Sequence, residues 1–167
     1  MSTTLRNNAC PTLWAILAAV GLLAPGAANA GKAASGSSPD RLAREILTTT
    51  GVKGGLVVHL GCGDGRLTAA LRADERYTVH GLDTDPANVE AARAHVASLG
   101  LYGPVSVERL AGAALPYTDN LVNLVVAEDC GPVPRDEILR VLAPEGIAYL
   151  KAGGAWEKIV KPRPADI

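Results

Sequence analysis

A glycine-rich turn and a downstream carboxylate carry most of the chemistry that this sequence offers. The segment VVHLGCGDG, residues 57–65, begins as an apolar run and ends in three glycines at alternate positions. Glycine has no Cβ atom, so a glycine-rich turn can bend tightly and pass close to a ligand. The next strand-like run, residues 77–82, ends at Asp83, whose carboxylate could accept hydrogen bonds from a ribose diol. Together the two features predict a site for a nucleoside-containing cofactor.

Three interpretations of the glycine turn remain open on its spacing alone. A dinucleotide fingerprint has the form G-x-G-x-x-G, but Arg66 occupies the position of its third glycine. This departure argues against a nicotinamide cofactor. The turn could instead serve a different nucleoside, or it could be a tight strand–helix connection that binds no ligand.

Elements of two kinds alternate along the chain and must position these residues. Short apolar runs, typical of strands, lie at residues 56–60, 77–82, 105–107, 121–127 and 147–150. Segments with helical spacing or capping residues lie at residues 38–50, 66–73, 86–99 and 136–142. The core must be largely aliphatic, since the chain contains no Phe. Strand–helix alternation with such a core predicts an α/β fold with a doubly wound parallel sheet.

Four segments resemble, in the right order, the motifs of class I S-adenosylmethionine-dependent methyltransferases. They are VVHLGCGDG at residues 57–65, VHGLDTDP at 79–86, LPYTDNLVNLV at 115–125 and EILRVLAPEG at 137–146. The resemblance extends over residues 38–150. It implies a Rossmann-like sheet of about five strands in the order 3-2-1-4-5, and it implies S-adenosyl-L-methionine as the cofactor.

The resemblance also implies roles for particular residues at the cofactor. Gly61, Gly63 and Gly65 would let the backbone approach the methionine part, and Asp83 would hold the ribose hydroxyls. Thr84 would lie beside the adenine. The full set of predicted cofactor-binding residues is His59, Gly61, Cys62, Gly63, Gly65, Asp83 and Thr84.

Two carboxylates at the end of the fourth predicted strand are the candidate catalytic residues. By resemblance, Glu128 would face the methyl group that is transferred. Glu128 or Asp129 could accept a proton from the methyl acceptor. The reaction asks little more of the protein, because the cofactor carries an activated carbon and the protein mainly orients the acceptor. The alternative is that both carboxylates belong to a solvated loop.

The sequence departs from the family pattern at three places. His59 stands where the family usually has Asp, a carboxylate that helps to hold the cofactor's ammonium group. A histidine is neutral or cationic near neutral pH, so this help is lost or reversed. Ala111 stands where the family often has an Asp that accepts from the adenine amino group. The chain also ends too soon for the family's hairpin of sixth and seventh strands, so it resembles a C-terminally truncated member.

The segment after the fifth predicted strand is therefore expected to be irregular. Residues 38–151 would form the methyltransferase-like domain, and residues 152–167 a tail or an interdomain linker. The fifth strand would then be an open edge of the sheet, and such an edge invites pairing with another chain. We expect a downstream domain or a partner to cover it.

The first 30 residues have the features of a secretory signal peptide. Arg6 precedes an apolar stretch at residues 13–23, and Ala28-Asn29-Ala30 follows as a cleavage pattern. The stretch is shorter than the ~20 residues of a membrane span, although a membrane anchor is the alternative. Residues 31–37 would be a flexible lead-in. These features predict export to the periplasm or the medium, with no membrane attachment after cleavage.

The net charge and the cysteines bear on the partners that the chain could have. The net charge of −1 gives no reason to expect a nucleic-acid partner. Cys62 and Cys130, the two cysteines after residue 30, lack the spacing of metal ligands, so no metal is expected. Both would follow neighbouring strands, so a disulfide across the mouth of the site is a hypothesis. The alternative is that both are small buried side chains.

Three functions are compatible with these features. The first is an S-adenosylmethionine-dependent methyltransferase domain that acts on an unknown small-molecule or protein acceptor. The second is a non-catalytic methyltransferase-like binding module of a larger exported protein, because S-adenosylmethionine is made in the cytoplasm. The third, an NAD-dependent oxidoreductase, is disfavoured by Arg66 in the glycine turn.

Overall fold

The computed structural model describes residues 38–163, which form four helices and six strands. The helices are α1 (Pro39–Thr50), α2 (Arg66–Ala70), α3 (Pro86–Ser98) and α4 (Arg135–Val141). The strands are β1 (Gly55–Leu60), β2 (Tyr77–Asp83), β3 (Val105–Arg109), β4 (Val122–Ala127), β5 (Leu142–Ala152) and β6 (Ala155–Val160). The predicted signal peptide, residues 1–30, and the lead-in, residues 31–37, lie outside the described residues, as do residues 164–167. Between residues 38 and 163, no helix is long and apolar enough to cross a membrane.

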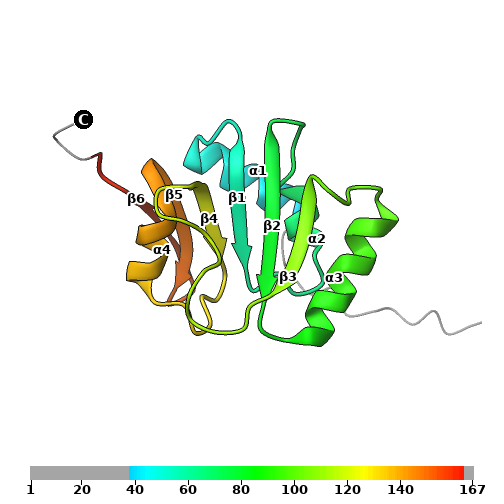
Figure 1. Ribbon diagram of the computed structural model, residues 1–167. Coiled ribbons are helices and arrows are strands. Elements are labelled where there is room, and N and C mark those ends of the chain that lie inside the picture. The colour runs from blue at the N-terminus through cyan, green and yellow to red at the C-terminus, as the bar shows by residue number, and fades with distance from the viewer. Residues whose placement is uncertain (1–37, 164–167) are drawn as a thin grey trace, which may run out of the picture. The chain divides into compact units, whose positions relative to one another are not determined.

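One mixed sheet organises these elements (Figure 1). Its strands lie in the order β3-β2-β1-β4-β5-β6, with β3 to β5 parallel to their neighbours and β6 antiparallel to β5. The predicted α/β fold with strand order 3-2-1-4-5 is confirmed, and a sixth strand is added to it. Because β1 lies between β2 and β4, the carboxyl ends of these strands meet at one edge. There Leu60 lies opposite Leu82 on one side and Ala127 on the other.

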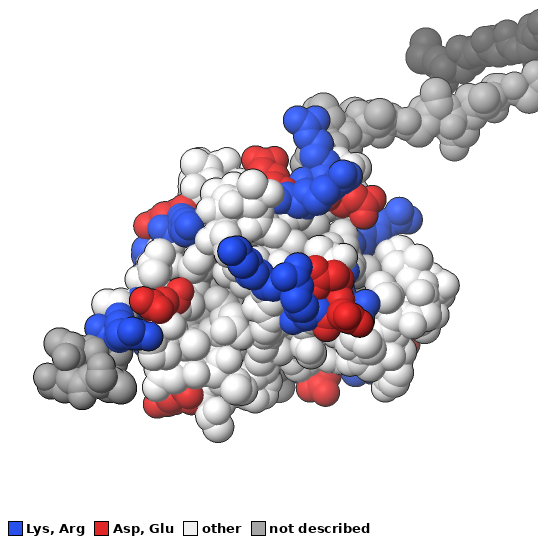
Figure 2. All heavy atoms as spheres, turned by 90° about the horizontal axis from the view of Figure 1, so that it is seen from above, with Lys and Arg blue, Asp and Glu red and all other residues white. Residues whose placement is uncertain are grey.

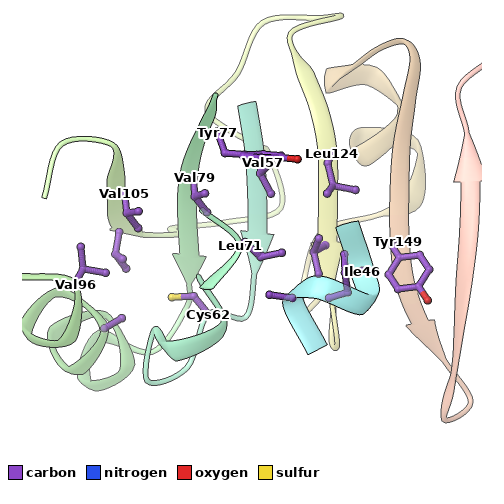
Figure 3. Close-up of a cluster of buried hydrophobic side chains, with 14 of the residues drawn as sticks. Ile46, Val57, Cys62, Leu71, Tyr77, Val79, Val96, Val105, Leu124 and Tyr149 are labelled. Carbon is purple, nitrogen blue, oxygen red and sulfur yellow. The ribbon is translucent and has the colours of Figure 1, made fainter. Parts of the chain in front are cut away.

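Helices cover both faces of the sheet. On one face, side chains of α1 and α3 pack over strand residues such as Val57 and Leu124, which are fully buried (Figure 3). On the other face, α4 and the β3–β4 connection (residues 110–121) pack over Val58 and Val125. Consecutive residues of a strand point to opposite faces. A strand that is covered on both faces therefore has apolar residues at consecutive positions, as the sequence shows.

Capping residues start the two long helices where the sequence predicts. The Ser38 hydroxyl accepts a hydrogen bond from the N–H of Arg41 at 3.3 Å. At α3, the Asp85 carboxylate accepts a hydrogen bond from the N–H of Ala87 at 2.9 Å. Such an oxygen satisfies one of the amides that a helix leaves unpaired at its start. The second cap fixes the start of α3 directly after the end of β2 at Asp83.

The segment after β5 forms a strand, so the prediction of an irregular tail is wrong. β5 continues to Ala152, and β6 returns along it from Ala155 to Val160. Gly153 and Gly154 make the turn with φ values of 58° and 89°. Positive φ at both central residues is what a tight two-residue hairpin of this kind requires. Adjacent glycines are compatible with a loop or with such a turn, and only the pairing of the following residues with β5 distinguishes the two.

Side chains of β6 fasten it to the rest of the fold. Trp156 stacks on Tyr149 of β5, with ring centroids 4.8 Å apart and planes 7° from parallel. The Lys158 ammonium donates to the carbonyl oxygens of Thr49 and Thr50 at 3.0 and 3.1 Å, at the negative end of α1. The edge of β5, which was expected to be open, is therefore covered by the chain itself. The reason for expecting a partner at that edge no longer holds.

A network of ion pairs and hydrogen bonds holds the β3–β4 connection over the sheet. Glu137 of α4 accepts from the N–H of Leu115 and from the Arg140 guanidinium, both at 2.7 Å. Arg140 also donates to the Asp119 carboxylate at 2.6 Å and to the carbonyl oxygen of Tyr117 at 3.0 Å. The Arg140 guanidinium and the Leu115 amide lower the pKa of Glu137 to about 2. These motif residues thus fix a connection that forms part of one cleft wall.

The amino ends of the parallel strands form an edge with charges of both signs. Figure 2 looks onto this edge, and basic side chains lie there beside acidic ones. Asp74 and Arg76, just before β2 begins, form an ion pair with a separation of 2.6 Å. The charge on this face is therefore mixed rather than of one sign.

Glu137→Gln should reduce the loss of stability in acid. Folding lowers the pKa of Glu137 from its ordinary 4.5 to about 2. Its charge therefore stabilises the fold above pH 4.5, and this stabilisation is lost as the pH falls toward 2. The free energy of unfolding of the wild type, from urea titrations, should fall more steeply over that range than that of E137Q. Glu75→Gln, at an exposed carboxylate, should keep the wild-type slope, and parallel wild-type and E137Q profiles would contradict the role of Glu137.

Candidate functional site

A cleft opens at the edge where β1, β2 and β4 end. Its volume is about 270 Å³, slightly below the ~300–1,000 Å³ that small-molecule sites usually have. In doubly wound sheets, ligands bind beyond the carboxyl ends of the strands, as here. The lining consists of Leu60, Gly61, Gly63, Leu82, Asp83, Thr84, Asn88, Leu110, Asp129, Cys130, Gly131 and Pro132.

A larger hollow of about 490 Å³ lies between α1, α2 and α3. Arg66 of α2 and His95 of α3 line it together with Arg72, which follows α2, and no strand residue does. None of the predicted site residues belongs to it, so we place the functional site in the smaller cleft. Within residues 38–163, no group of three or more His, Cys, Asp or Glu side chains is arranged to hold a metal ion.

The three glycines of the turn have different roles. All have positive φ, with 68° at Gly61, 52° at Gly63 and 77° at Gly65. A Cβ atom on Gly63 would meet nothing within 4 Å, so this residue borders open space in the cleft. A Cβ atom on Gly65 would lie 2.8 Å from the Cα atom of Ala92. Gly65 does not line the cleft, and its position indicates that it lets the start of α2 pack against α3.

The carboxylate of Asp83 ties the glycine turn to the start of α3. Its Oδ2 accepts from the N–H of Gly63 at 2.9 Å and from the Asn88 side chain at 3.2 Å. Its Oδ1 accepts from the N–H of Asp85 at 2.9 Å. Asp83 is only 6% exposed, and a buried charge needs partners of this kind. A carboxylate offers about four lone-pair sites, so one remains for a ligand hydroxyl in the cleft.

His59 is buried next to the lining residue Leu60 but does not itself line the cleft. Its Nδ1 lies 2.8 Å from the Thr68 hydroxyl of α2. Burial lowers the pKa of His59 to about 4, and the charge of Asp83 offsets only part of that effect. The imidazole is therefore neutral near pH 7. Compared with the Asp of the family, the negative charge at this position is lost but not reversed.

Cys62 and Cys130 are separate thiols that turn toward opposite faces of the sheet. Cys62 packs into the core under α1 and α3, as Figure 3 shows, whereas Cys130 packs against the core under α4. Burial, reinforced by the charge of Asp83, raises the pKa of Cys62 to about 12. The hypothesis of a disulfide across the site is wrong, because the two side chains point to different cores.

The two candidate catalytic carboxylates lie in different surroundings. Both are exposed, but Asp129 lines the cleft, and its Oδ1 accepts from the N–H of Gly131 at 2.9 Å. Glu128 is exposed outside the lining, and its Oε2 lies 3.4 Å from the Lys151 ammonium of β5. An exposed ion pair of this kind contributes little to stability. The pair places the Glu128 carboxylate next to β5.

The structure brings together five of the predicted site residues and adds others to them. The predicted residues in the lining are Gly61, Gly63, Asp83, Thr84 and Asp129, and those outside it are His59, Cys62, Gly65 and Glu128. Seven lining residues were not predicted as site residues: Leu60 and Leu82 at the strand ends, Cys130, and also Asn88, Leu110, Gly131 and Pro132, which sequence reasoning missed altogether. Asn88 could have been predicted from the sequence. The cap at Asp85 starts α3 directly after Asp83, so the first turn of the helix, which includes Asn88, lies beside that carboxylate. Leu110, Gly131 and Pro132 come from loops, whose paths local sequence does not determine.

The strand order, the glycine turn after β1 and the buried carboxylate that ends β2 define a class I methyltransferase fold. The chain belongs to the methyltransferase domain family, which matches residues 57–154. The match begins in β1 and ends in the β5–β6 turn, so it includes every residue that lines the cleft.

Solved structures of known proteins resemble this chain over about two thirds of its length. A SAM-dependent methyltransferase from Aquifex aeolicus is 26% identical, with 65% of this chain and 61% of that chain covered and a TM-score of 0.55. The [4+2]-cyclase SpnF is 27% identical, with 66% and 43% covered and a TM-score of 0.59. Geranyl diphosphate C-methyltransferase from Streptomyces coelicolor A3(2), solved with S-adenosyl-L-homocysteine, shares the fold at 16% identity, with 66% and 44% covered and a TM-score of 0.59. No curated protein matches the chain in sequence.

The chain spans only 43–61% of the length of the three structures. One of the three is named a cyclase, so the fold by itself does not establish methyl transfer.

The lining suits S-adenosylmethionine, the cofactor of this family. Gly63 leaves open space where a side chain would stand, and Asp83 keeps one acceptor for a ribose hydroxyl. Leu110 gives the lining an apolar side chain, while the neighbouring Ala111 is exposed outside the lining. Asp83, Thr84 and Asn88 would hold the nucleoside at this end of the cleft.

Two alanine substitutions in the turn should separate packing from ligand binding. Gly65→Ala should lower the free energy of unfolding by more than about 2 kcal/mol, because positive φ and the backbone of Ala92 both oppose a Cβ atom. Gly63→Ala should cost only ~1 kcal/mol of backbone strain, yet it should weaken binding of S-adenosylhomocysteine because its Cβ projects into the cleft. Urea unfolding and calorimetric titration measure the two effects. An equal loss of stability in both variants would contradict these roles.

Proposed function

We propose that this chain binds S-adenosylmethionine in the cleft and transfers its methyl group to an acceptor at the open side. The observation that carries the proposal is the carboxylate of Asp83, which borders the cleft although it is 6% exposed. The backbone amides of Gly63 and Asp85 fix it in place. A carboxylate at the end of the second strand, next to a glycine turn, is placed to receive a ribose hydroxyl.

The residues around the cleft would act mainly by orientation. Bound S-adenosylmethionine supplies a methyl carbon that its sulfonium activates for transfer. Asp83, Asn88 and Thr84 would fix the nucleoside, and Leu110 would cover the adenine. A fixed nucleoside limits the positions of the rest of the cofactor, and holding an acceptor in line with a reactive carbon removes much of the entropic barrier.

Glu128 is the proposed proton acceptor on the acceptor side. When a protonated oxygen or nitrogen takes the methyl group, a carbon–heteroatom bond forms and the carbon–sulfur electron pair stays with sulfur. The acceptor's proton must then go to a base. Glu128 is exposed just after β4, lies outside the lining assigned to the cofactor, and pairs with Lys151 of β5. Its position therefore supports a role toward the acceptor and not toward the cofactor.

The geometry favours an acceptor group on the surface of a larger molecule, such as a protein. The cleft is small and open, and about half of its lining residues are already assigned to the cofactor. An acceptor that brings its own surface would complete the site from outside. A further part of a longer protein could provide the same cover, since the related structures are longer than this chain.

A second candidate function is a methyltransferase-like module that binds without turnover. We propose that the protein is exported, on the strength of the charged, apolar and small residues that follow one another in residues 1–30. Export would separate the site from the compartment where S-adenosylmethionine is made. The neutral His59 in place of the family's carboxylate also favours this alternative. Binding of S-adenosylhomocysteine without methyl transfer to any added acceptor would identify it.

Calorimetric titration with S-adenosylhomocysteine tests the cofactor site. The wild type should bind it saturably, and Asp83→Asn should bind at least about tenfold more weakly, because an NH₂ group replaces an acceptor oxygen. Asp74→Asn makes the same change before β2, at the opposite edge of the sheet, and should bind as the wild type does. Binding of NAD in place of S-adenosylhomocysteine, or equal affinities of wild type and D83N, would contradict the proposal.

A further inference from the structure

The cleft carries negative charge and no basic side chain. Its lining contains the carboxylates of Asp83 and Asp129 but no Lys, Arg or His. The Asp83 oxygens already accept three hydrogen bonds. Asp129 uses only Oδ1, which accepts from the N–H of Gly131, and within residues 38–163 no group donates to its Oδ2. Asp129 therefore presents an uncommitted carboxylate oxygen at the cleft.

His59 cannot provide the charge that the family places at its position. Its ring is 3% exposed and its Nδ1 is paired with the Thr68 hydroxyl. The ring is neutral near pH 7 because burial disfavours its charged form. An ammonium group that leaves water for a site without a carboxylate loses hydration and gains no ion pair. If the cofactor's ammonium is held here, another acceptor must hold it.

Asp129 lies beside the turn that would border the methionine part of the cofactor. Its carbonyl oxygen is 3.3 Å from the position that a Cβ atom on Gly61 would occupy. The strands before the two turns are direct neighbours, with Leu60 of β1 opposite Ala127 of β4. The turn after β4 thus offers both a carbonyl and a carboxylate next to the glycine turn.

We propose that Asp129 binds the ammonium group of the cofactor's amino acid, in place of the carboxylate that the family has at position 59. The proposal rests on the proposed function, because it takes S-adenosylmethionine as the occupant of the cleft. It changes the sequence-based prediction for Asp129 from proton acceptor to cofactor-binding residue and leaves the first role to Glu128. The charge has moved from the end of β1 to the turn after β4, and the cleft selects ligands that carry an ammonium group.

Two ligands and two variants test this assignment. The ligands are S-adenosylhomocysteine and its deaminated analogue 4-(5′-adenosylthio)butanoate, which differ only in the ammonium group. Asp129→Asn keeps an acceptor for the Gly131 amide but removes the charge. Glu128→Gln makes the matched change at the adjacent carboxylate, outside the lining. Calorimetric titration gives the four dissociation constants of the variants and the two of the wild type.

The wild type should bind S-adenosylhomocysteine about tenfold more tightly than the deaminated analogue. D129N should bind both alike, with its affinity for the analogue unchanged, which also shows that the variant is folded. E128Q should keep the preference, and added salt should reduce it in the wild type.

Other outcomes would overturn the assignment. If D129N keeps the preference, the ammonium is held elsewhere. If D129N loses both ligands equally, Asp129 supports the turn and does not bind the ammonium. A wild type that binds both ligands without preference overturns this assignment alone, whereas a wild type that binds neither overturns the proposed function as well.

Discussion

The carboxylate of Asp83 connects two turns that would otherwise be independent. It accepts from the amide of Gly63 after β1 and from the amide of Asp85 before α3. A hydrogen bond to a charged group contributes ~1.5–3 kcal/mol, so these two bonds hold both turns at the end of β2. Because residues of the glycine turn and Asn88 in the first turn of α3 both line the cleft, the shape of the cleft depends on this one buried charge. The aliphatic cores on both sides of the sheet fix the strand end from which Asp83 projects.

Features of the fold that depend on local residue chemistry could be predicted, and those that depend on distant contacts could not. The caps at Ser38 and Asp85 and the apolar strands follow from short stretches of sequence. Gly63 and Gly65 belong to the same motif, so the sequence predicts the same role for both. In the structure, Gly65 instead makes room for Ala92 of α3, a contact that the spacing of the glycines does not predict. β6 was missed because its order depends on pairing with β5 and on the Lys158 contacts at the end of α1. The disulfide hypothesis failed for a related reason, since strand adjacency does not say which face a side chain reaches.

Family membership and activity depend on different features of this chain, and the charges in the cleft bear on activity. The fold and the matched residues place the chain among methyltransferase domains. The carboxylate that the family uses beside the glycine turn is replaced by a neutral imidazole paired with Thr68. Asp129 brings negative charge back to the cleft from the neighbouring turn. The proposed role of Asp129 at the cofactor's ammonium group would account for the departure at His59 without loss of function.

Hydrogen–deuterium exchange of the backbone amides, with and without S-adenosylhomocysteine, tests whether the nucleoside binds between the glycine turn and the start of α3, where Asp83 holds both. Binding should slow exchange in residues 61–65 and 83–88 and change it little at the amino ends of the strands. Protection confined to the hollow between α1, α2 and α3, or saturating binding with no protection at the glycine turn, would contradict that placement of the nucleoside.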